Sequence, residues 1–344
     1  MNEQNIAKVS VIDPIGKAID RVKEVLFNPF DVGRWFIIGF CAWLAMLGQG
    51  GVGGGGGSFN PGGGGPSSAE VKAWFLEHLP LIISIGLGLF VLGIVIGIVF
   101  LWLSSRGRFM FLHCVALNKA EVKAPWHKFR NQSNSLFVFR LVLGVIGFIC
   151  IGVMVGVLAL LIILLVRNSA YAAPALVVGI ILLVLMVIGI RIVFALINKF
   201  TKDFVVPIMY LRGSRCLDAW REFWSMLTSN KWRFTLYILF QIVIAICVGM
   251  IAGMIGCLVS CFTCCIFIPA MIPILGLPFL LLFTYILTLV LLPLHIFGRS
   301  YSLYYLAQYG GQYDVFIPIA QLQEPPIVGP QGEEPVNEPP KPVQ

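Results

Sequence analysis

Charged residues are scarce in this sequence. Asp, Glu, Lys and Arg account for 12% of its 344 residues, whereas an average soluble domain carries about 25%. Hydrophobic residues account for 58% of the chain. Because too few polar side chains are present to cover so much apolar surface in water, the composition excludes a water-soluble globular fold. It indicates a protein embedded in lipid.

The sequence also lacks the residue patterns of catalytic and metal sites. None of its four histidines has a metal-ligand partner three or four residues away, and no set of Ser, His and Asp can be assembled. We therefore predict no enzyme activity, no cofactor and no metal. A cysteine cluster comes closest to a metal site, because its members share one helix face: Cys257, Cys261, Cys264 and Cys265. Packing is our preferred interpretation of these cysteines, and a disulfide or a metal site is the alternative.

Acidic residues are absent from every long apolar run. Several of these runs exceed the roughly 20 residues that a helix needs to cross a hydrocarbon core of about 30 Å. Lipid offers the backbone no hydrogen-bond partner, which favours helices. The sequence thus predicts an all-α integral membrane protein with about six transmembrane helices, near residues 35–48, 79–104, 136–166, 175–198, 235–259 and 272–298. The first run has only 14 residues, so a re-entrant segment is its alternative.

Positive residues alternate between the connecting segments. Lys and Arg number five before residue 35, six in 105–135 and seven in 199–234, but one in 49–78 and none in 260–271. Because cytoplasmic loops retain Lys and Arg, this alternation predicts that both termini lie in the cytoplasm. The net charge of +8 is then explained by topology, and we predict no nucleic-acid partner.

Residues 1–34 precede the predicted membrane domain of residues 35–298. They include an amphipathic helix, for which we predict Asp13 as the cap and Pro14 as the first helical residue. Its apolar face predicts a cytoplasmic helix that either lies on the inner leaflet or packs beneath the bundle.

Three other segments have distinctive compositions. Residues 50–66 are rich in glycine and uncharged, which predicts a flexible external loop. Residues 299–322 are predicted to be a cytoplasmic amphipathic segment. Residues 323–344 are rich in Pro and Glu, which predicts a disordered cytoplasmic tail.

Three segments that leave an inward-running helix resemble one another. They are FMFLHCVALNKAEVKAPW from Phe109, FVVPIMYLRGSRCLDAW from Phe204 and YSLYYLAQYGGQYDVF from Tyr301. In the first two, an aromatic pair also matches, with Trp126 and Phe129 corresponding to Trp220 and Phe223. The similarity predicts a parallel internal repeat of helix, amphipathic cytoplasmic elbow and helix, begun a third time. Chance similarity between aromatic segments is the alternative.

Two arginines are the only charged residues inside the predicted spans. Arg140 and Arg191 both lie toward the cytoplasmic ends of their helices. We expect both side chains to extend to the inner headgroups, and an anion pathway is the alternative.

The segments DFVVPIMYLRG, AWREFW, NPFDVGRWFIIGF and FGRSYSLYYLAQYG resemble a group of uncharacterised prokaryotic multi-pass membrane proteins. That group is similar to the membrane domain attached to some glycerophosphodiester phosphodiesterases. The resemblance covers most of residues 25–316 and implies a bacterial inner membrane. The catalytic domain of those enzymes is absent from this chain, so the resemblance implies no activity.

The basic, aromatic elbows suggest our first functional hypothesis. It is a non-enzymatic, multi-pass membrane protein that binds anionic lipids, or membrane or cytoplasmic proteins, through Arg212, Arg215, Arg221, Trp126 and Trp220. The alternative is a transporter or channel for a small or lipidic solute. The repeat favours the alternative, whereas the lack of acidic residues within the spans opposes it.

Overall fold

The computed structural model describes residues 9–47, 77–167, 172–263 and 273–316. Every long regular element in these ranges is an α-helix, which confirms the all-α class. The elements are α1 (Asp13–Leu26), α2 (Val32–Met46), α4 (Leu79–Leu117), α5 (Lys123–Lys128), α6 (Arg130–Arg167), α7 (Ala172–Phe200), the π-helical turn η2 (Thr201–Val205), α8 (Val206–Arg212), α9 (Cys216–Ser229), α10 (Lys231–Thr263), α11 (Pro273–Val290), α12 (Leu292–Ala307) and the short 3-10 turn η4 (Gly311–Tyr313). The predicted loop at 50–66 and tail at 323–344 lie outside the described residues.

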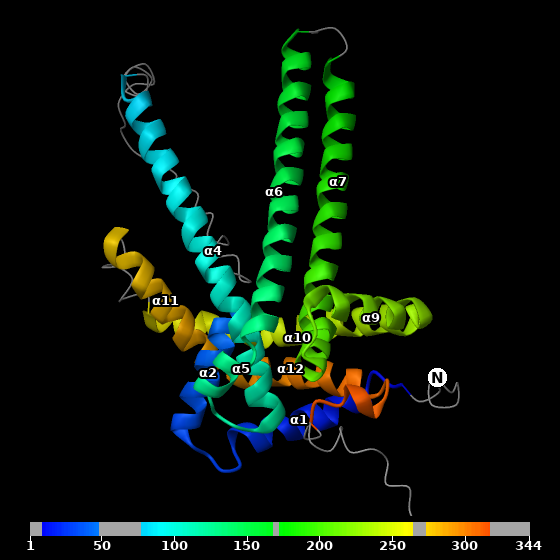
Figure 1. The fold of residues 1–344 in the computed structure, drawn as a ribbon. Coiled ribbons are helices and arrows are strands. Elements are labelled where there is room, and N and C mark those ends of the chain that lie inside the picture. Colours follow the sequence, from blue (N-terminus) through cyan, green and yellow to red (C-terminus); the bar gives the residue numbers. More distant parts are fainter. Residues whose placement is uncertain (1–8, 48–76, 168–171, 264–272, 317–344) are drawn as a thin grey trace, which may run out of the picture.

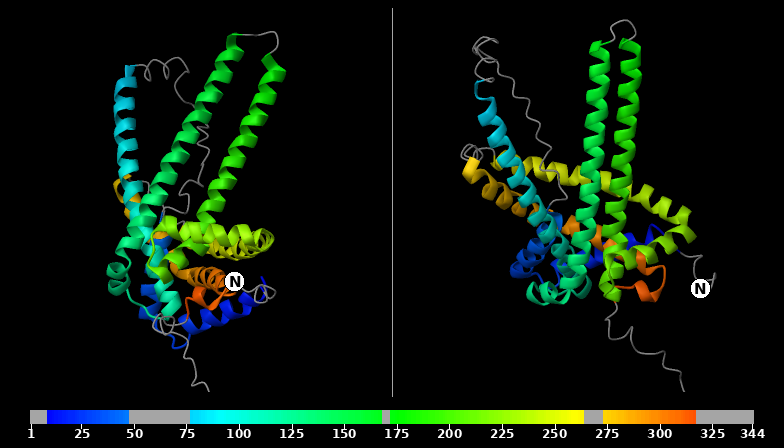
Figure 2. Two further views of the ribbon diagram at one scale, coloured as in Figure 1. Left: turned by 45° about the vertical axis from the view of Figure 1, so that its right-hand side comes forward. Right: turned by 45° about the horizontal axis from the view of Figure 1, so that its top comes forward.

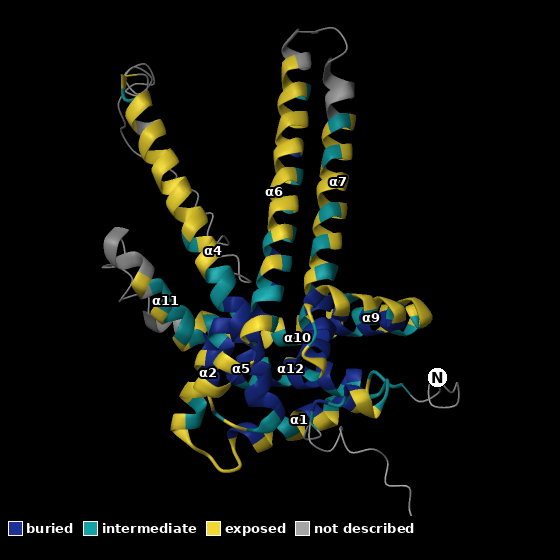
Figure 3. Cartoon of the chain, viewed as in Figure 1, coloured by how far each residue is buried: buried dark blue, intermediate teal, exposed yellow. Residues whose placement is uncertain are grey.

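The molecule has a compact base from which long helices project (Figure 1). We define the base as α1, α2, α5, η2, α8, α9 and α12, together with the C-terminal ends of α4 and α7. Above it, α4, α6 and α7 are exposed over most of their length (Figure 3). Their exposed side chains are apolar: Leu89 is 64% exposed, Phe148 64% and Leu182 62%. Such surfaces are unfavourable in water and suit contact with lipid.

In the described part of the chain, four helices are long and apolar enough to cross a membrane. They comprise Leu79–Leu117, Arg130–Ile163, Val178–Arg212 and Lys231–Leu258. A fifth candidate is the pair Leu280–Val290 and Leu292–Ala307, which bends by 65° at a short break. The α2 helix has 15 residues, or about 22 Å at roughly 1.5 Å per residue, which is short of a full span. These lengths establish a helical membrane protein, and the count of six spans stays a prediction.

The helices continue past the ends predicted for the spans. The α4 helix runs to Leu117, and the chain stays helical from Ala172 to Arg212 through α7, η2 and α8. Phe109 and Phe204 therefore lie within continuous helix and not in connecting segments. The α10 helix runs crosswise to α6 and α7 in each view (Figures 1 and 2).

The last predicted span is broken. A single helix was expected over 272–298, but α11 ends at Val290 and α12 begins at Leu292, with Pro293 as its second residue. Proline lacks the backbone N–H that would continue a helix from the preceding turn, which accounts for a break at this point.

The amphipathic helix α1 packs against α12 in the base. Ala18 is fully buried, and the Tyr301 hydroxyl donates to the carbonyl oxygen of Val11 at 2.8 Å. This arrangement matches the second of the two sequence interpretations, a helix beneath the bundle. The predicted cap was wrong by one residue, because Ile12 precedes the helix and Asp13 is its first residue. The hydroxyl oxygen of Ser10 accepts hydrogen bonds from the backbone N–H groups of Ile12 and Asp13.

Two arginines close the C-terminal end of α4. Arg21 donates to the carbonyl oxygens of Val115 at 2.8 Å and of Ala116 at 2.7 Å, and Arg34 donates to the carbonyl oxygen of Asn118 at 2.8 Å. Cations at a helix C-terminus satisfy unpaired carbonyl oxygens and oppose the helix dipole. Because Arg21 lies in α1 and Arg34 in α2, this end of α4 ties both helices into the base.

The three similar segments share a backbone feature. Phe109, Phe204 and Tyr301 are fully buried. Nine residues after each aromatic residue, the backbone takes a positive φ: 54° at Asn118, 64° at Gly213 and 140° at Gly310. A left-handed residue ends a helix by turning the chain sharply, and glycine adopts it without a steric penalty. In the first two copies this residue directly follows the helix, whereas α12 ends at Ala307 and Gly310 lies three residues further along.

The first two copies also share their ring packing. Phe109 stacks on Phe129 with centroids 5.9 Å apart and an interplanar angle of 15°, and Phe204 stacks on Phe223 at 5.1 Å and 9°. Each aromatic pair joins a descending helix to the segment that follows it: Phe223 lies in α9, and Phe129 is the residue directly after α5. This common geometry supports the parallel repeat.

Candidate anion-binding site

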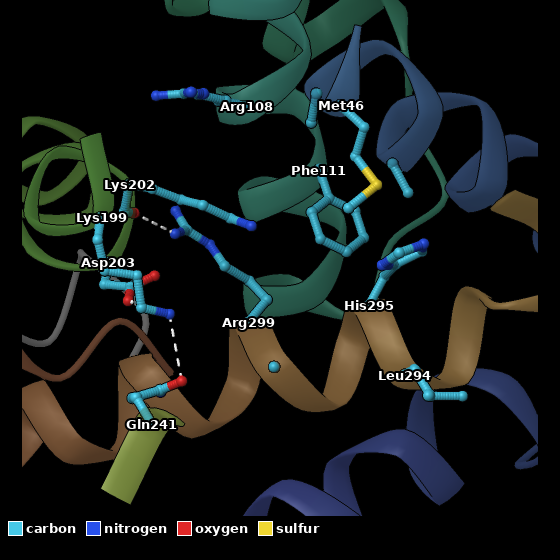
Figure 4. Close-up of a pocket in the computed structure, with 13 residues that line it drawn as sticks. Met46, Arg108, Phe111, Lys199, Lys202, Asp203, Gln241, Leu294, His295 and Arg299 are labelled. Atoms are coloured by element: carbon cyan, nitrogen blue, oxygen red, sulfur yellow. Dashed lines mark hydrogen bonds and ion pairs between the residues drawn. The ribbon is translucent and has the colours of Figure 1, made fainter. Parts of the chain in front are cut away.

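A buried pocket lies where α2, α4, α7, η2, α10 and α12 meet in the base (Figure 4). Its cavity is about 160 Å³. That space exceeds the roughly 30 Å³ share of one water molecule but is smaller than the 300–1,000 Å³ typical of drug-sized ligands. The charged residues that line it are Arg108, Lys199, Lys202, Asp203 and Arg299. Four cations thus face one carboxylate.

The three similar segments explain how these charges come together. Arg108 and Asp203 each directly precede the buried aromatic residue of their copy. Lys202 and Arg299 each lie two residues before theirs, so they occupy equivalent positions. Because the three aromatic residues are buried in the same base, the charged residues beside them are brought to a common centre.

The single carboxylate is fully engaged. Lys199 forms an ion pair with Asp203 at 2.9 Å, and the hydroxyl of Tyr237 donates to Asp203 at 3.1 Å. Gln241 completes the network: its amide nitrogen donates to the Tyr237 hydroxyl, and its oxygen accepts from Lys199 at 3.2 Å. Asp203 therefore neutralises Lys199 and leaves the remaining cations of the pocket in excess.

Two arginines in the pocket have N–H groups without partners among the described residues. Arg108 is 5% exposed, and its Nε and Nη1 atoms are buried without a hydrogen bond. Arg299 is also 5% exposed; its Nη1 donates to the carbonyl oxygen of Lys202, but its Nη2 has no partner. A buried donor without a partner costs about 1–3 kcal/mol, and more when it is charged. Such a cost is typical of a site that binds a ligand of opposite charge.

Arg140 of α6 is a further buried cation. It is 7% exposed, and its Nη1 donates to the hydroxyls of Ser104 and Ser105, each at 3.2 Å. The expectation that Arg140 extends to the headgroups was wrong, because α4 presents these two hydroxyls to the buried guanidinium group. Arg191 remains exposed on α7.

The predicted arginine contacts lie away from the pocket, around α8 and α9. Arg212 forms an ion pair with Glu222 at 2.6 Å, and its guanidinium lies 5.8 Å from the ring centroid of Tyr313. Tyr313 donates to the same carboxylate at 2.8 Å. Burial, and then the hydrogen bond to Glu222, raise the pKa of the Tyr313 hydroxyl. Arg215 and Arg221 are exposed.

Both predicted tryptophan contacts are packed against other aromatic residues. Trp126 meets Trp102 edge to face at 5.9 Å, and Arg106 lies over both rings, 4.4 Å from Trp102 and 4.6 Å from Trp126. Trp220 is half-buried and packs against the rings of Phe139 and Phe223. These contacts give both tryptophans a structural role that the sequence did not reveal.

The cysteine cluster falls largely outside the described residues. Cys257 is exposed on α10. Cys264 and Cys265 lie beyond the described part of the chain, as does the side chain of Cys261. Within the described ranges, no group of three or more His, Cys, Asp or Glu residues could hold a metal ion.

A comparison with protein families gives one match, which spans the base and its pocket. Residues 9–316 match a family of unknown function, DUF7544. The chain belongs to this family. Every charged residue of the pocket falls within the matched range. No curated protein and no solved structure matches the chain. The resemblance to the membrane domain of glycerophosphodiester phosphodiesterases stays a prediction.

Sequence reasoning missed the pocket because it placed the charges in loops. Lys202 and Asp203 follow the predicted span 175–198, and Arg108 follows the predicted span 79–104. All three residues were therefore interpreted as exposed to solvent. A signal was nevertheless present. Aligning the repeats on their aromatic residues places a charge one or two positions before the aromatic residue in each copy.

Proposed function

We propose that this is a non-enzymatic membrane protein that binds a phosphate-bearing anion in the base pocket. The observation that carries the proposal is the pair of buried arginines, Arg108 and Arg299, with N–H groups that lack partners. Guanidinium groups present several N–H donors in a fixed plane that suits the oxygens of phosphate. A neutral ligand would leave the excess positive charge of the pocket uncompensated.

The ligand chemistry admits two sources, a phospholipid headgroup and free phosphate. The cavity is large enough for a phosphate-sized oxyanion, and the lipid-facing helices of the protein would place it beside phospholipids. Binding such headgroups in the base would make the protein an organiser of anionic lipid. The exposed Arg215 and Arg221 of α9 extend this proposal to anionic lipids or partner proteins at the rim of the base.

In the proposed orientation, the protein spans a bacterial inner membrane and the base lies on the cytoplasmic side. The segments with six and seven Lys or Arg residues, 105–135 and 199–234, both contribute to the base. The opposite end of the α6–α7 hairpin carries one, Arg167. Positive residues concentrate on the cytoplasmic side, which supports this orientation and cytoplasmic termini.

A binding role suits the pocket better than catalysis. Asp203 already accepts from Tyr237 and pairs with Lys199, so it is not free to act as a general base. The pocket offers donors and positive charge, which hold an anion in place.

Thermal unfolding of the purified protein tests this proposal. The protein in neutral detergent is titrated with inorganic phosphate, and separately with phosphatidylglycerol in mixed micelles, at constant ionic strength with chloride as the control anion. We expect one or both phosphate-bearing probes to raise the unfolding temperature with saturation, because a ligand that binds only the folded state stabilises it. Phosphate alone would indicate a soluble ligand, and phosphatidylglycerol alone a headgroup. Equal behaviour of both probes and chloride would contradict the proposal.

The broken helix favours a second candidate function, transport of an anionic solute. The break between α11 and α12 lies close to the pocket, which α12 lines with His295 and Arg299. Discontinuous helices beside a central binding site are typical of secondary transporters. Proteoliposomes that release trapped phosphate faster than protein-free vesicles would support transport, and an unchanged rate would exclude it for this solute.

A further inference from the structure

The hairpin of α6 and α7 carries an apolar groove along its length. The two helices lie side by side in all views (Figures 1 and 2). The groove has a volume of about 530 Å³ and is lined by Met154, Val155 and Leu158 of α6 and by Leu183 and Val187 of α7, among others.

Two glycines bring the helices together at the groove. A Cβ atom at Gly147 would lie 3.4 Å from the ring of Phe194, and one at Gly179 would lie 3.3 Å from Leu161. These contacts are near opposite ends of the hairpin. Between these two contacts the helices leave the groove open.

One charged residue lines this apolar groove. Arg191 is exposed on α7, and neither α6 nor α7 contains an Asp or Glu residue. Asn198 lies seven residues further along, on the same helix face. Arg191 is nine residues from the end of α7 at Phe200, or about 14 Å at roughly 1.5 Å per residue. An arginine at this depth in an apolar surface needs an anion, and the hairpin supplies none.

We infer that the groove between α6 and α7 binds an anionic phospholipid whose phosphate contacts Arg191. Its acyl chain lies along the apolar side chains toward Leu158 and Leu183. Charge complementarity identifies this occupant: a zwitterionic lipid would fill the groove equally well but would bring no net negative charge to Arg191. The site is separate from the base pocket and does not rest on the function proposed for it.

Native mass spectrometry tests this inference directly. The detergent-purified protein is titrated with phosphatidylglycerol and with phosphatidylcholine of the same acyl chains. We expect the wild type to retain phosphatidylglycerol preferentially. Arg191→Gln should weaken phosphatidylglycerol binding about fivefold and reduce the preference, because one basic residue near an anionic headgroup contributes about that factor. Arg191→Lys should keep the preference.

Three variants make the test specific. Lys17→Gln removes a positive charge from an exposed position of α1 and should leave the preference unchanged. Val155→Trp fills the groove while Arg191 remains, and it should weaken the binding of both lipids. Arg108→Gln removes a cation of the base pocket and should leave the Arg191 lipid in place. Equal binding of both lipids by the wild type, or a preference lost in Arg108→Gln and kept in Arg191→Gln, would overturn the inference.

Discussion

Arg299 of α12 donates a hydrogen bond from Nη1 to the backbone carbonyl oxygen of Lys202, within the π-helical turn that follows α7. A π-turn changes the regular hydrogen-bond pattern of a helix, and such turns occur frequently at functional sites. The bond anchors one side of the Arg299 guanidinium and joins equivalent positions of two repeats. The other side, at Nη2, stays available to a ligand in the pocket.

Replacing Arg108 should have opposite effects on the stability of the ligand-free protein and on its binding of phosphate. Arg108→Gln removes a buried cation with unpartnered N–H groups, so the ligand-free protein should become more stable. A gain of 1 kcal/mol would raise the unfolding temperature by about 2–4 °C. The same variant should lose the phosphate-dependent stabilisation of the wild type. Both effects are measured by thermal unfolding with and without phosphate.

Lys17→Gln is the control for that variant, since it removes an equal charge from an exposed side chain. It should leave both the unfolding temperature and the response to phosphate near those of the wild type. A full phosphate response in Arg108→Gln would show that Arg108 does not contact the ligand.

Removing the carboxylate of the pocket should tighten anion binding. Asp203→Asn keeps the shape of the side chain but leaves Lys199 unneutralised, so the pocket gains one unit of positive charge. We expect the dissociation constant for phosphate to fall about tenfold, which corresponds to about 1.4 kcal/mol. The unfolding temperature of the ligand-free variant should fall, because the buried cations then repel one another. Isothermal titration calorimetry at two salt concentrations measures the change; weaker binding of phosphate would argue against a ligand in this pocket.

Local sequence patterns predicted the helices, but the pocket could not be predicted because it forms only when the helices pack together. Apolar runs located α4, α6, α7 and α10, because length and hydropathy are properties of a single segment. The break before Pro293 was not predicted, since the region contains several prolines and the sequence alone does not show which of them interrupts the helix. The pocket charges belong to three segments nearly 100 residues apart, and only tertiary packing shows that Arg108 and Arg299 face one cavity.

Gly107 should tolerate no side chain. A Cβ atom there would lie 2.5 Å from backbone atoms of Leu44 and Ala45, and the backbone of α2 cannot move aside without leaving α4. Gly107→Ala should therefore destabilise the protein by about 1–3 kcal/mol. Gly97 is the matched control on the same helix, because nothing lies within 4 Å of its Cβ position. Gly97→Ala should be neutral or stabilising by about 0.5–1 kcal/mol. Equal stability of the two variants in denaturant would refute the close contact of α2 with α4.

Arg21 should hold α1 on the base. Its bonds to the carbonyl oxygens of Val115 and Ala116 are lost in Arg21→Gln, which also removes a cation from the end of α4. We expect amide hydrogen exchange in residues 13–26 to accelerate about tenfold or more, because hydrogen bonds to charged groups contribute about 1.5–3 kcal/mol. Lys17→Gln changes an exposed charge of the same helix and should leave exchange unaltered. Similar exchange in both variants would contradict the capping role.

The base pocket is tested most directly by cryo-electron microscopy of the protein in lipid nanodiscs that contain phosphatidylglycerol, in phosphate buffer. We expect density for a tetrahedral anion between Arg108 and Arg299, with an oxygen about 2.7–2.9 Å from Nη2 of Arg299. Continuity of that density with acyl chains would identify a lipid headgroup, and isolated density would identify free phosphate. A pocket that holds no such density, with both guanidinium groups paired to protein carboxylates, would contradict the anion-binding function.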